Sequence, residues 1–421
     1  MTTTSCEAMG LFPDIPMPRD SVLQSILQLT SGDVPPVRNL GTYVSAPNAN
    51  ESDWVLAAWS EHNLINRAEY VGLTAIENQC LSVLKSLWHA PDQVAGCSAT
   101  GSTEAALIAA SALLHRWRAR GGIGRPNLVL GPAAHVCWRK FCALWDVEPR
   151  SIPLVPHHDP IADPTAITDG CDLGTIGVVA TLGSPEFGLY DPVGDIAASL
   201  DGLQQRTGLD ISVHVDAASG GFVAPFLQPD QVWDFRLERV TSINASGHKY
   251  GLTRPSVGWL LWRAGGAAEP LLSVGAPYIG TGDPEPTLSF SRSVVPVLEQ
   301  YMQLMERGRR GYTVIHRQSQ LIAAALADRL AQVPALRVIG TGADLPVVSF
   351  TSTARQAQVT ELAALLAAGG WSIPVYRLRA PMDAIEAGRI VVRADLSPEL
   401  ATRLVDDVAH AVAKLIGSTT L

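Results

Sequence analysis

The chain has little of what nucleic-acid-binding, membrane-spanning or secreted proteins need. Its net charge is −9, and it has no long basic run and no alternation of aromatic and basic residues, so we expect no nucleic-acid partner. No apolar run could cross a bilayer without an interruption by Gly, Pro or a charged residue, so we expect no membrane partner. The N-terminal MTTTSCEAMGLFPDIP lacks the features of a signal peptide. These absences predict a soluble cytoplasmic protein.

Cysteine and metal-binding patterns are also scarce. No C-x-x-C pair occurs among the six cysteines, which are Cys6, Cys80, Cys97, Cys137, Cys142 and Cys171. Scattered cysteines in a long chain without a secretory signal are expected to be reduced thiols. His157, His158 and Asp159 resemble a metal tripod, but adjacent ligands in a Pro-flanked loop are more typical of a solvated turn. We therefore expect no metal site.

What the chain does contain is typical of a globular enzyme of more than one domain. It has 421 residues, of which 47% are hydrophobic and 17% charged. Apolar residues at helical spacing predict two helices between Ser52 and Trp88, with a break near 62–66. We expect an N-terminal arm over residues 1–50, a large domain over 51–300 and a small C-terminal α/β domain over 301–421. A long helical region at 296–333 is expected to bridge the two domains.

The segment from Ile211 to Gly251 contains two apolar, β-rich runs with polar residues at their ends. The first run ends at Asp216, and the second leads into Ser246, His248 and Lys249. The carboxyl ends of parallel strands face one ligand crevice, so Asp216 and Lys249 can converge on one molecule. Pyridoxal phosphate (PLP) suits this pair, because a lysine amine forms a Schiff base with its aldehyde and a carboxylate holds its ring nitrogen protonated. The alternative is two strand ends followed by ordinary solvated residues.

A second segment, ATGSTEA, offers a place for the phosphate of such a cofactor. Gly101, Ser102 and Thr103 precede a long helix-forming run, where main-chain N–H groups, two hydroxyls and the helix dipole all favour an anion. A plain helix cap with Glu104 in the first turn is the alternative. His135 stands at another turn into a helix, where its ring could stack on a planar cofactor or simply bond to the main chain.

Several longer strings resemble one family. INASGHKYG, HVDAASGGFVAPF, SLWHAP, ATGSTEA, HVCWRKF, WDVE, QVWDFRL, GYTVIHR and WSIPVY together closely resemble the group II PLP-dependent amino acid decarboxylases, and glutamate decarboxylase in particular. The resemblance implies a carboxy-lyase of the aspartate aminotransferase-like fold (fold type I). That fold has a large α/β domain with a mostly parallel seven-stranded sheet and a small C-terminal α/β domain. The resemblance also implies PLP as cofactor and an L-amino acid, glutamate or a related one, as substrate.

The resemblance implies roles for residues around the cofactor. Lys249 would form the Schiff base, Asp216 would pair with the pyridine nitrogen, and Ala218 and His135 would pack on the two faces of the ring. His248 is both a cofactor contact and a candidate for moving a proton. The other implied cofactor contacts in this chain are Gly101, Ser102, Thr103, Thr181 and Ser246.

The resemblance also implies roles at the substrate side and between subunits. Tyr278 matches the tyrosine of a mobile catalytic loop that protonates the carbanion, and Arg393 matches the arginine that holds the substrate α-carboxylate. Thr42 and Asn66 match positions that bind a distal carboxylate. Ser291 resembles a serine that reaches the phosphate in the neighbouring subunit, which implies a homodimer or a larger homo-oligomer.

Two departures from the family pattern leave the substrate and the product open. Asn66 replaces an aspartate, and an amide cannot share a proton with a carboxylate, so specificity for glutamate is not assured. Pro185, in TLGSPEFG, stands where the family has a pair that contains threonine, and proline offers neither a hydroxyl nor an N–H. Decarboxylation linked to oxidative deamination, which gives an aldehyde, is therefore an alternative. A catalytically silent PLP-binding protein is a second one.

Overall fold

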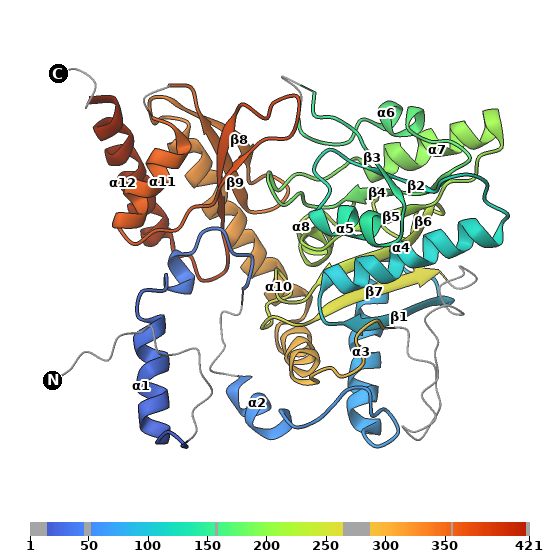
Figure 1. Ribbon diagram of the computed structural model, residues 1–421, viewed down its shortest axis with the longest axis horizontal. Coiled ribbons are helices and arrows are strands. Elements are labelled where there is room, and N and C mark those ends of the chain that lie inside the picture. The colour runs from blue at the N-terminus through green and yellow to red at the C-terminus, as the bar shows by residue number, and fades with distance from the viewer. Residues whose placement is uncertain (1–14, 46–51, 156–158, 264–286, 355–356, 418–421) are drawn as a thin grey trace.

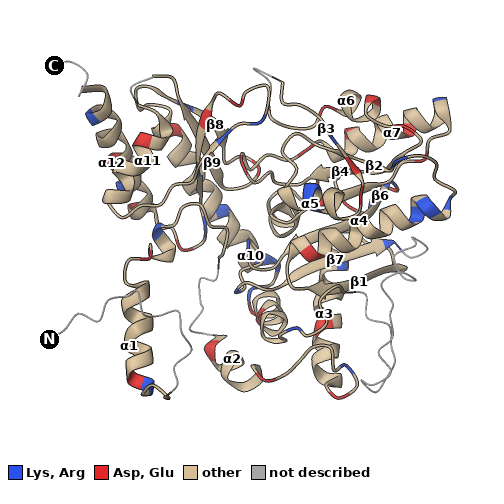
Figure 2. Cartoon of the chain, in the orientation of Figure 1, with Lys and Arg blue, Asp and Glu red and all other residues tan. Residues whose placement is uncertain are grey.

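The computed structural model describes residues 15–45, 52–155, 159–263, 287–354 and 357–417, which form a large and a small α/β domain with an N-terminal segment beside them (Figure 1). Acidic and basic residues are interspersed over the elements of both domains (Figure 2). Among the described helices, none is long and apolar enough to cross a membrane.

The large domain is built on a seven-stranded sheet of order β1-β7-β6-β5-β4-β2-β3. All neighbouring strands pair in parallel except β7, which is antiparallel to both β1 and β6. The strands are β1 (Val94–Ala99), β2 (Asn127–Leu130), β3 (Glu148–Ser151), β4 (Thr175–Thr181), β5 (Val213–Asp216), β6 (Val240–Ser246) and β7 (Gly258–Arg263). The prediction of a mostly parallel seven-stranded sheet is confirmed.

Helices cover both faces of this sheet, which explains the continuous apolar runs of its central strands. Leu128 and Leu130 of β2 pack in one cluster with α4 and α5, whereas Val129 between them packs in another cluster with α7. The predicted pair of helices between residues 52 and 88 is confirmed as α2 and α3. The helices of this domain are α2 (Asp53–Trp59), α3 (Val71–Leu87), α4 (Ser102–Ala119), α5 (Val136–Leu144), α6 (Pro164–Asp169), α7 (Val193–Thr207) and α8 (Ala224–Leu227).

The long helix α10 (Val295–Leu330) joins the two domains. Its first turns, with Val297 and Leu298, pack in the core of the large domain, and its last turns, with Leu326 and Leu330, pack in the core of the small one. At Gly308 the helix is interrupted by a positive φ of 54°, a conformation that glycine adopts without a Cβ penalty. The helix therefore belongs to both cores.

The small domain has an antiparallel four-stranded sheet of order β10-β11-β9-β8. Figure 1 shows β8 and β9 of this sheet apart from the strands of the large domain. The elements of the small domain are β8 (Leu336–Thr341), β9 (Val347–Ser352), α11 (Val359–Ala368), β10 (Val375–Arg377), β11 (Glu386–Val391) and α12 (Pro398–Gly417).

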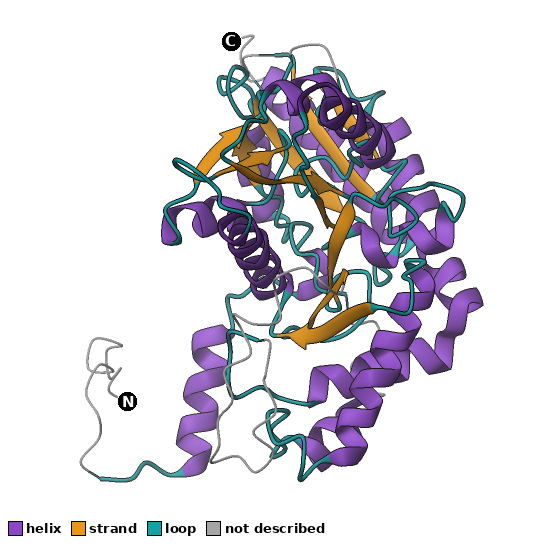
Figure 3. Ribbon diagram, turned by 90° about the vertical axis from the view of Figure 1, so that its right-hand side faces the viewer, coloured by secondary structure: helices purple, strands orange, loops and turns teal. Residues whose placement is uncertain are grey.

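The N-terminal segment belongs with the small domain rather than the large one. Asn39 bridges to Ser372, and Leu40 is buried in the small-domain core. Before it, α1 (Arg19–Thr30) buries none of its residues and stands away from the body of the chain (Figures 1 and 3). This helix consequently exposes a set of apolar side chains: Val22, Leu23, Ile26, Leu27 and Leu29.

Candidate active site

A cavity of about 510 Å³ lies at the carboxyl ends of the central strands, beside the first turn of α4. Strands β4 and β5 deliver Thr181 and Asp216 to it from their last residues. The sequence-predicted residues that line this cavity are Gly101, Ser102, Thr103, His135, Thr181, Asp216, Ala218, His248 and Lys249. The topology therefore brings together segments that are far apart in the sequence, as expected for the ligand crevice of a parallel sheet.

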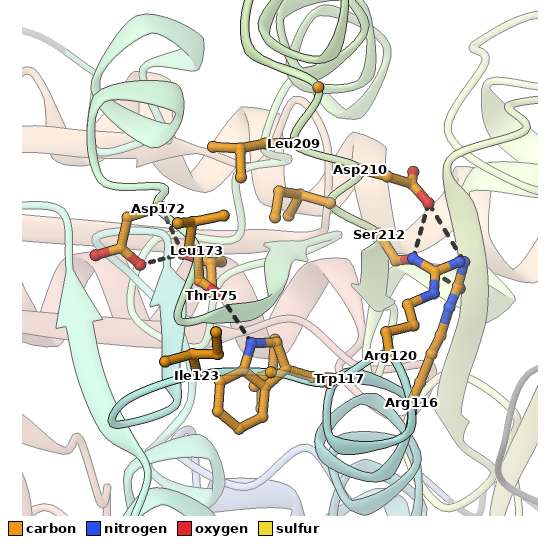
Figure 4. A pocket seen from close by; sticks show the side chains of 15 residues that line it. Arg116, Trp117, Arg120, Ile123, Asp172, Leu173, Thr175, Leu209, Asp210 and Ser212 are labelled. Carbon is orange, nitrogen blue, oxygen red and sulfur yellow. Dashed lines mark hydrogen bonds and ion pairs between the residues drawn. The ribbon is translucent and has the colours of Figure 1, made fainter.

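A second cavity, of about 340 Å³, lies at the opposite edge of the sheet, before the first residues of β4 and β5. Arg116 and Arg120 both point at Asp210, and the indole Nε1 of Trp117 donates a hydrogen bond to the carbonyl of Leu173 (Figure 4). These polar groups satisfy one another within the protein. The first cavity, with its concentration of sequence-predicted residues, is the better candidate for an active site.

The first turn of α4 forms the floor of one end of the active-site cavity. Gly101 caps the helix in an extended conformation, and the hydroxyls of Ser102 and Ser246 are hydrogen-bonded to each other at 2.7 Å. A Cβ on Gly258 of β7 would lie 2.2 Å from the carbonyl carbon of Gly101, so the strand approaches this turn as closely as only glycine permits. The result is a helix start that lines the cavity with main-chain N–H groups and hydroxyls, which suits a phosphate.

Asp216 is held in a fixed orientation by N–H groups. It is only 3% exposed, at the end of β5. The Nε1 of Trp138 donates to Oδ2 at 2.8 Å, while the side-chain amide of Asn244 and the main-chain N of Ala218 each donate to Oδ1 at 3.2 Å. These groups only donate, so they match a carboxylate that carries no proton of its own.

Lys249 follows β6, and its half-buried side chain lines the same cavity. Its Nζ donates to the hydroxyl of Ser219 at 3.2 Å and lies 4.9 Å from the centre of the Tyr43 ring. Burial lowers the pKa of Lys249, and the negative charge of Asp216 opposes this shift only in part. A lowered pKa increases the fraction of neutral amine, the form that attacks an aldehyde.

His135, Thr181 and His248 present polar atoms to the cavity wall. His135 caps α5 and its Nδ1 accepts a hydrogen bond from the main-chain N of Cys137 at 3.2 Å, so it makes the local bond and lines the cavity as well. Burial lowers the pKa of His135, and lowers that of His248 to about 4, so both rings are neutral near pH 7. Thr181 Oγ1 and His248 Nδ1 are buried without a hydrogen-bond partner among the described residues.

The residues predicted to bind the substrate or the phosphate of a neighbouring subunit are not among the described residues that line the cavity. Thr42 is half-buried, and its hydroxyl accepts from the main-chain N of Val44 at 3.1 Å. Asn66 is half-buried in the loop between α2 and α3. Ser291 is exposed and accepts a hydrogen bond from the side chain of Asn63 at 3.1 Å. Tyr278 lies outside the described residues, as do His157 and His158.

The geometry does not bring Arg393 to the cavity. Its side chain is 2% exposed, and its Nη atoms donate to the carbonyls of Pro36, Asn39 and Thr42 at 2.7–3.1 Å. Its Nε donates to Asp395 at 3.1 Å. With these bonds, Arg393 fastens the N-terminal segment to the small domain, which leaves its guanidinium poorly placed for a substrate carboxylate.

A different arginine of the same strand region, Arg389 of β11, approaches Lys249. Its charge contributes to lowering the pKa of Lys249, and its guanidinium lies 5.2 Å from the same Tyr43 ring that Lys249 covers. It donates to the carbonyls of Pro185 at 2.5 Å and Gly41 at 3.1 Å, while its buried Nε has no partner among the described residues. Arg389 was not among the residues predicted from the sequence, where its only signal is a second arginine four residues before Arg393 in RIVVRAD.

Comparison with known proteins decides the family. The conserved domain of pyridoxal-dependent decarboxylases matches residues 28–353. The chain belongs to the pyridoxal-dependent decarboxylase family. Its fold agrees with this assignment, since the solved structure of glutamate decarboxylase from Lactobacillus brevis superposes with a TM-score of 0.91 at 33% identity, covering 96% of this chain and 94% of that one.

Curated relatives extend the similarity over most of the sequence. Glutamate decarboxylase beta of Listeria monocytogenes is 34% identical over 391 residues, which is 90% of this chain and 84% of that protein. Glutamate decarboxylase of Aliivibrio fischeri is 36% identical over 386 residues, 89% of this chain and 83% of that protein. A more distant structure, sphingosine-1-phosphate lyase of Burkholderia pseudomallei, shares the fold with a TM-score of 0.81 at 24% identity. The chain is a PLP-dependent amino acid decarboxylase, a carboxy-lyase.

The cavity fits this cofactor on its own chemistry. PLP needs a phosphate site, an amine for its aldehyde and a carboxylate for its ring nitrogen. The three groups come from the walls of one cavity: the start of α4 at Gly101, Ser102 and Thr103 (the α4 turn), Lys249 and Asp216. The unpartnered Thr181 Oγ1 and His248 Nδ1 are buried polar atoms that a ligand rich in oxygen would satisfy.

Proposed function

We propose that the chain removes the α-carboxyl group of L-glutamate or a closely related L-amino acid, giving the amine and CO2. The observation that carries this proposal is the convergence of Lys249, Asp216 and the α4 turn on one cavity. The glutamate decarboxylases among its relatives support glutamate as the first substrate to test. PLP, when bound, supplies a protonated ring that withdraws the electron pair left by the departing CO2.

In this mechanism the residues of the chain bind, orient and move protons. The α4 turn, with Gly101, Ser102 and Thr103, and Ser246 and His248 beside it, holds the phosphate. Asp216 keeps a proton on the ring nitrogen, and the donors that fix its carboxylate keep it aligned. Ala218 and His135 would pack against the two faces of the pyridine ring. Lys249 would hold the aldehyde of the cofactor through its amine, whose lowered pKa favours the neutral form.

Arg389 is the residue that we propose for binding the substrate α-carboxylate. Its guanidinium lies against the same Tyr43 ring as the lysine amine, and its buried Nε has no partner in the described part of the chain. Its other bonds go to main-chain carbonyls, which a carboxylate can displace because hydrogen bonds to an ionised acceptor are stronger. Arg393 remains the position that the family resemblance suggested, and it serves as the comparison variant.

The proton that replaces CO2 on the substrate carbon requires a donor near Lys249. We propose His248 or Tyr278 for this role. His248 lines the cavity but is neutral near pH 7, because burial lowers its pKa to about 4, so it needs to receive a proton before it can give one. A tyrosine hydroxyl carries its proton at neutral pH, which favours Tyr278.

The substrate side chain is tested directly by product analysis. Protein loaded with PLP is incubated in air with glutamate, aspartate, glutamine or valine, and amines and aldehydes are identified by mass spectrometry. The amine of glutamate is the expected product and would show that Asn66 is tolerated. An amine from glutamine alone would place Asn66 in an amide-binding site. No product from any substrate, although PLP is bound through Lys249, would indicate a silent PLP-binding protein.

Decarboxylation linked to oxidative deamination is the second candidate, and Pro185 favours it. Pro185 lines the cavity where the family has a hydroxyl, and its carbonyl accepts from the Tyr43 hydroxyl at 3.0 Å and from Arg389. Where no proton donor is near, O2 could oxidise the substrate carbon instead, so that the amino acid, O2 and water would give an aldehyde, CO2, ammonia and hydrogen peroxide. The same incubation distinguishes the two, since aldehyde that disappears under nitrogen identifies the oxidative reaction.

We further propose that the active unit is a homodimer in the cytoplasm. Helix α1 buries none of its own residues, and its apolar side chains are suited to a second copy of the chain. Ser291 is exposed and beside Ser289, which lines the cavity, so it can reach a partner molecule at this rim. A reducing compartment agrees with the free thiols of the described cysteines, which are Cys80, Cys97, Cys137, Cys142 and Cys171.

A further inference from the structure

Behind Asp216, a line of buried polar side chains runs across two neighbouring strands. His214 and Asp216 of β5 stand opposite Ser242 and Asn244 of β6 in the parallel register. Because side chains alternate between the two faces of a strand, these residues share one face. His214 Nδ1 lies 2.7 Å from Ser242 Oγ, and His214 Nε2 lies 2.7 Å from Asn244 Oδ1. The amide of Asn244 then donates to Asp216.

The chemistry of the groups sets the direction of every bond in this line. Asp216 accepts only, so Asn244 must turn its NH2 toward it and its carbonyl toward His214. That carbonyl requires a proton on Nε2 of His214, which leaves Nδ1 as the acceptor for the hydroxyl of Ser242. All the donors of the line therefore point toward Asp216.

The surroundings of His214 keep it in this single form. It is fully buried, and the ring of Trp138, which itself donates to Asp216, lies 4.9 Å from the His214 ring. Burial lowers the pKa of His214 to about 4, and the opposing influence of Asp216 is smaller. A neutral imidazole with one defined tautomer is a fixed hydrogen-bond relay rather than a proton carrier.

We propose that His214 and Asn244 are positioning residues that act through Asp216 on the ring nitrogen of PLP. Each bond restrains the next group, from Ser242 to His214, Asn244 and finally the carboxylate. Their effect is therefore directed at one atom of the cofactor. A purely structural role in the sheet would affect every form of the cofactor alike.

The test compares PLP with 1-deazapyridoxal 5′-phosphate, in which carbon replaces the ring nitrogen. Dissociation constants of both are measured by fluorescence titration of the apo-protein, so substrate and turnover are not needed and failure of the proposed reaction does not affect the result. Asn244→Leu is expected to weaken PLP binding about tenfold, the effect of one hydrogen bond to a charged group. Binding of the deaza analogue is expected to stay unchanged.

Two further variants separate positioning from folding. His214→Gln keeps an N–H that can reach Asn244 and is expected to retain most of the PLP affinity, whereas His214→Leu is expected to lose it. His316→Leu is the matched control, because His316 is also buried and neutral but packs against Phe226 and Tyr312. It is expected to lower thermal stability without changing the ratio of the two affinities. An equal loss for both cofactors in Asn244→Leu, or no loss for either, would overturn the proposal.

Discussion

Around Lys249, two positive side chains share one aromatic ring. Lys249 and Arg389 both lie against Tyr43, at 4.9 and 5.2 Å from its centre, and a positive charge on either lowers the cost of placing an anionic group nearby. Burial raises the pKa of Tyr43 to about 12, so its hydroxyl keeps its proton and the ring stays neutral. Acidic groups are also close, since Asp216 acts on Lys249 and Glu186 acts on Tyr43, so the two cations stand in a site of mixed charge.

Separate substitutions of Arg389, in β11, and of Arg393, two residues after this strand, test which arginine contacts the substrate. Arg389→Met is expected to lower kcat/KM roughly 100-fold, because hydrogen bonds to charged groups contribute about 1.5–3 kcal/mol each. Arg393→Met is expected to lower the melting temperature, since its bonds hold residues 36–42, and to reduce kcat/KM less than Arg389→Met does. Steady-state kinetics and thermal unfolding of both variants decide the matter. A larger kinetic loss in Arg393→Met would restore the assignment suggested by the family pattern.

For single residues, the sequence predicted the reactive side chains that stand at the ends of apolar strands. It did not predict the contacts that tertiary packing brings to the site. Lys249 and Asp216 interrupt apolar runs, which is visible in a single sequence. Trp138 lies in the HVCWRKF motif, but its hydrogen bond to Asp216 depends on how α5 packs against β5, which the sequence does not give. Asn244 was also visible, as an alternating polar position in a buried strand, and this period-two pattern in SINAS was the missed signal.

Among the elements, β7 controls the position of the α4 turn. Gly258→Ala would place a Cβ 2.2–2.6 Å from main-chain atoms of Gly101 and Ser102, which cannot yield as a flexible side chain would. The turn is expected to move, and PLP affinity to fall at least tenfold, because a phosphate site needs aligned N–H groups. Equilibrium dialysis of the apo-protein with PLP measures this. Gly194→Ala, whose nearest contact is 3.5 Å away, is the control and should bind normally.

Helix α1 provides the prediction on assembly. Ile26 and Leu27 are 51% and 63% exposed, so charges there should cost the isolated chain little but should destabilise an apolar interface. The double variant Ile26→Asp and Leu27→Asp is expected to shift the dimer toward monomer in light scattering coupled to gel filtration. Leu173→Asp, at an exposed position of 77% on the far side of the large domain, is the matched control. An unchanged dimer in the α1 variant would exclude this helix from the interface.

The order of helices and strands was largely predictable because apolar periodicity is strong in the large domain. The direction of β7 was not. GWLLWR is apolar on both faces like its parallel neighbours, and only the connection, a short one after Lys249, requires it to return antiparallel. The role of the N-terminal segment was equally hidden, since Leu40 reaches a core formed by residues more than 280 positions later.

For the whole molecule, the buried histidines predict how stability depends on pH. Burial lowers the pKa of His214 and His248 to about 4 and that of His316 to about 3, against an ordinary value of 6.5. The neutral rings contribute stability above pH 6.5, and this contribution is lost as the pH falls toward 4. Each is expected to cost on the order of 1 kcal/mol per pH unit in that range. Urea unfolding at pH 7, 6 and 5 measures it, and His316→Gln should flatten the dependence.

The antiparallel strand β7 has a consequence for the order in which the newly made chain becomes functional. β7 ends at residue 263 and pairs with β1, at residues 94–99. It therefore joins β1 to the rest of the sheet. The α4 turn follows β1 directly and is linked to the end of β6 by the Ser246–Ser102 hydrogen bond, so the phosphate site has its full support only after β7 has been synthesised. Closing such a long loop is slow, and it comes late in translation. Nascent chains that end before residue 258 should therefore leave the ribosome unable to retain PLP, and the cofactor should add to the chain as the sheet is completed.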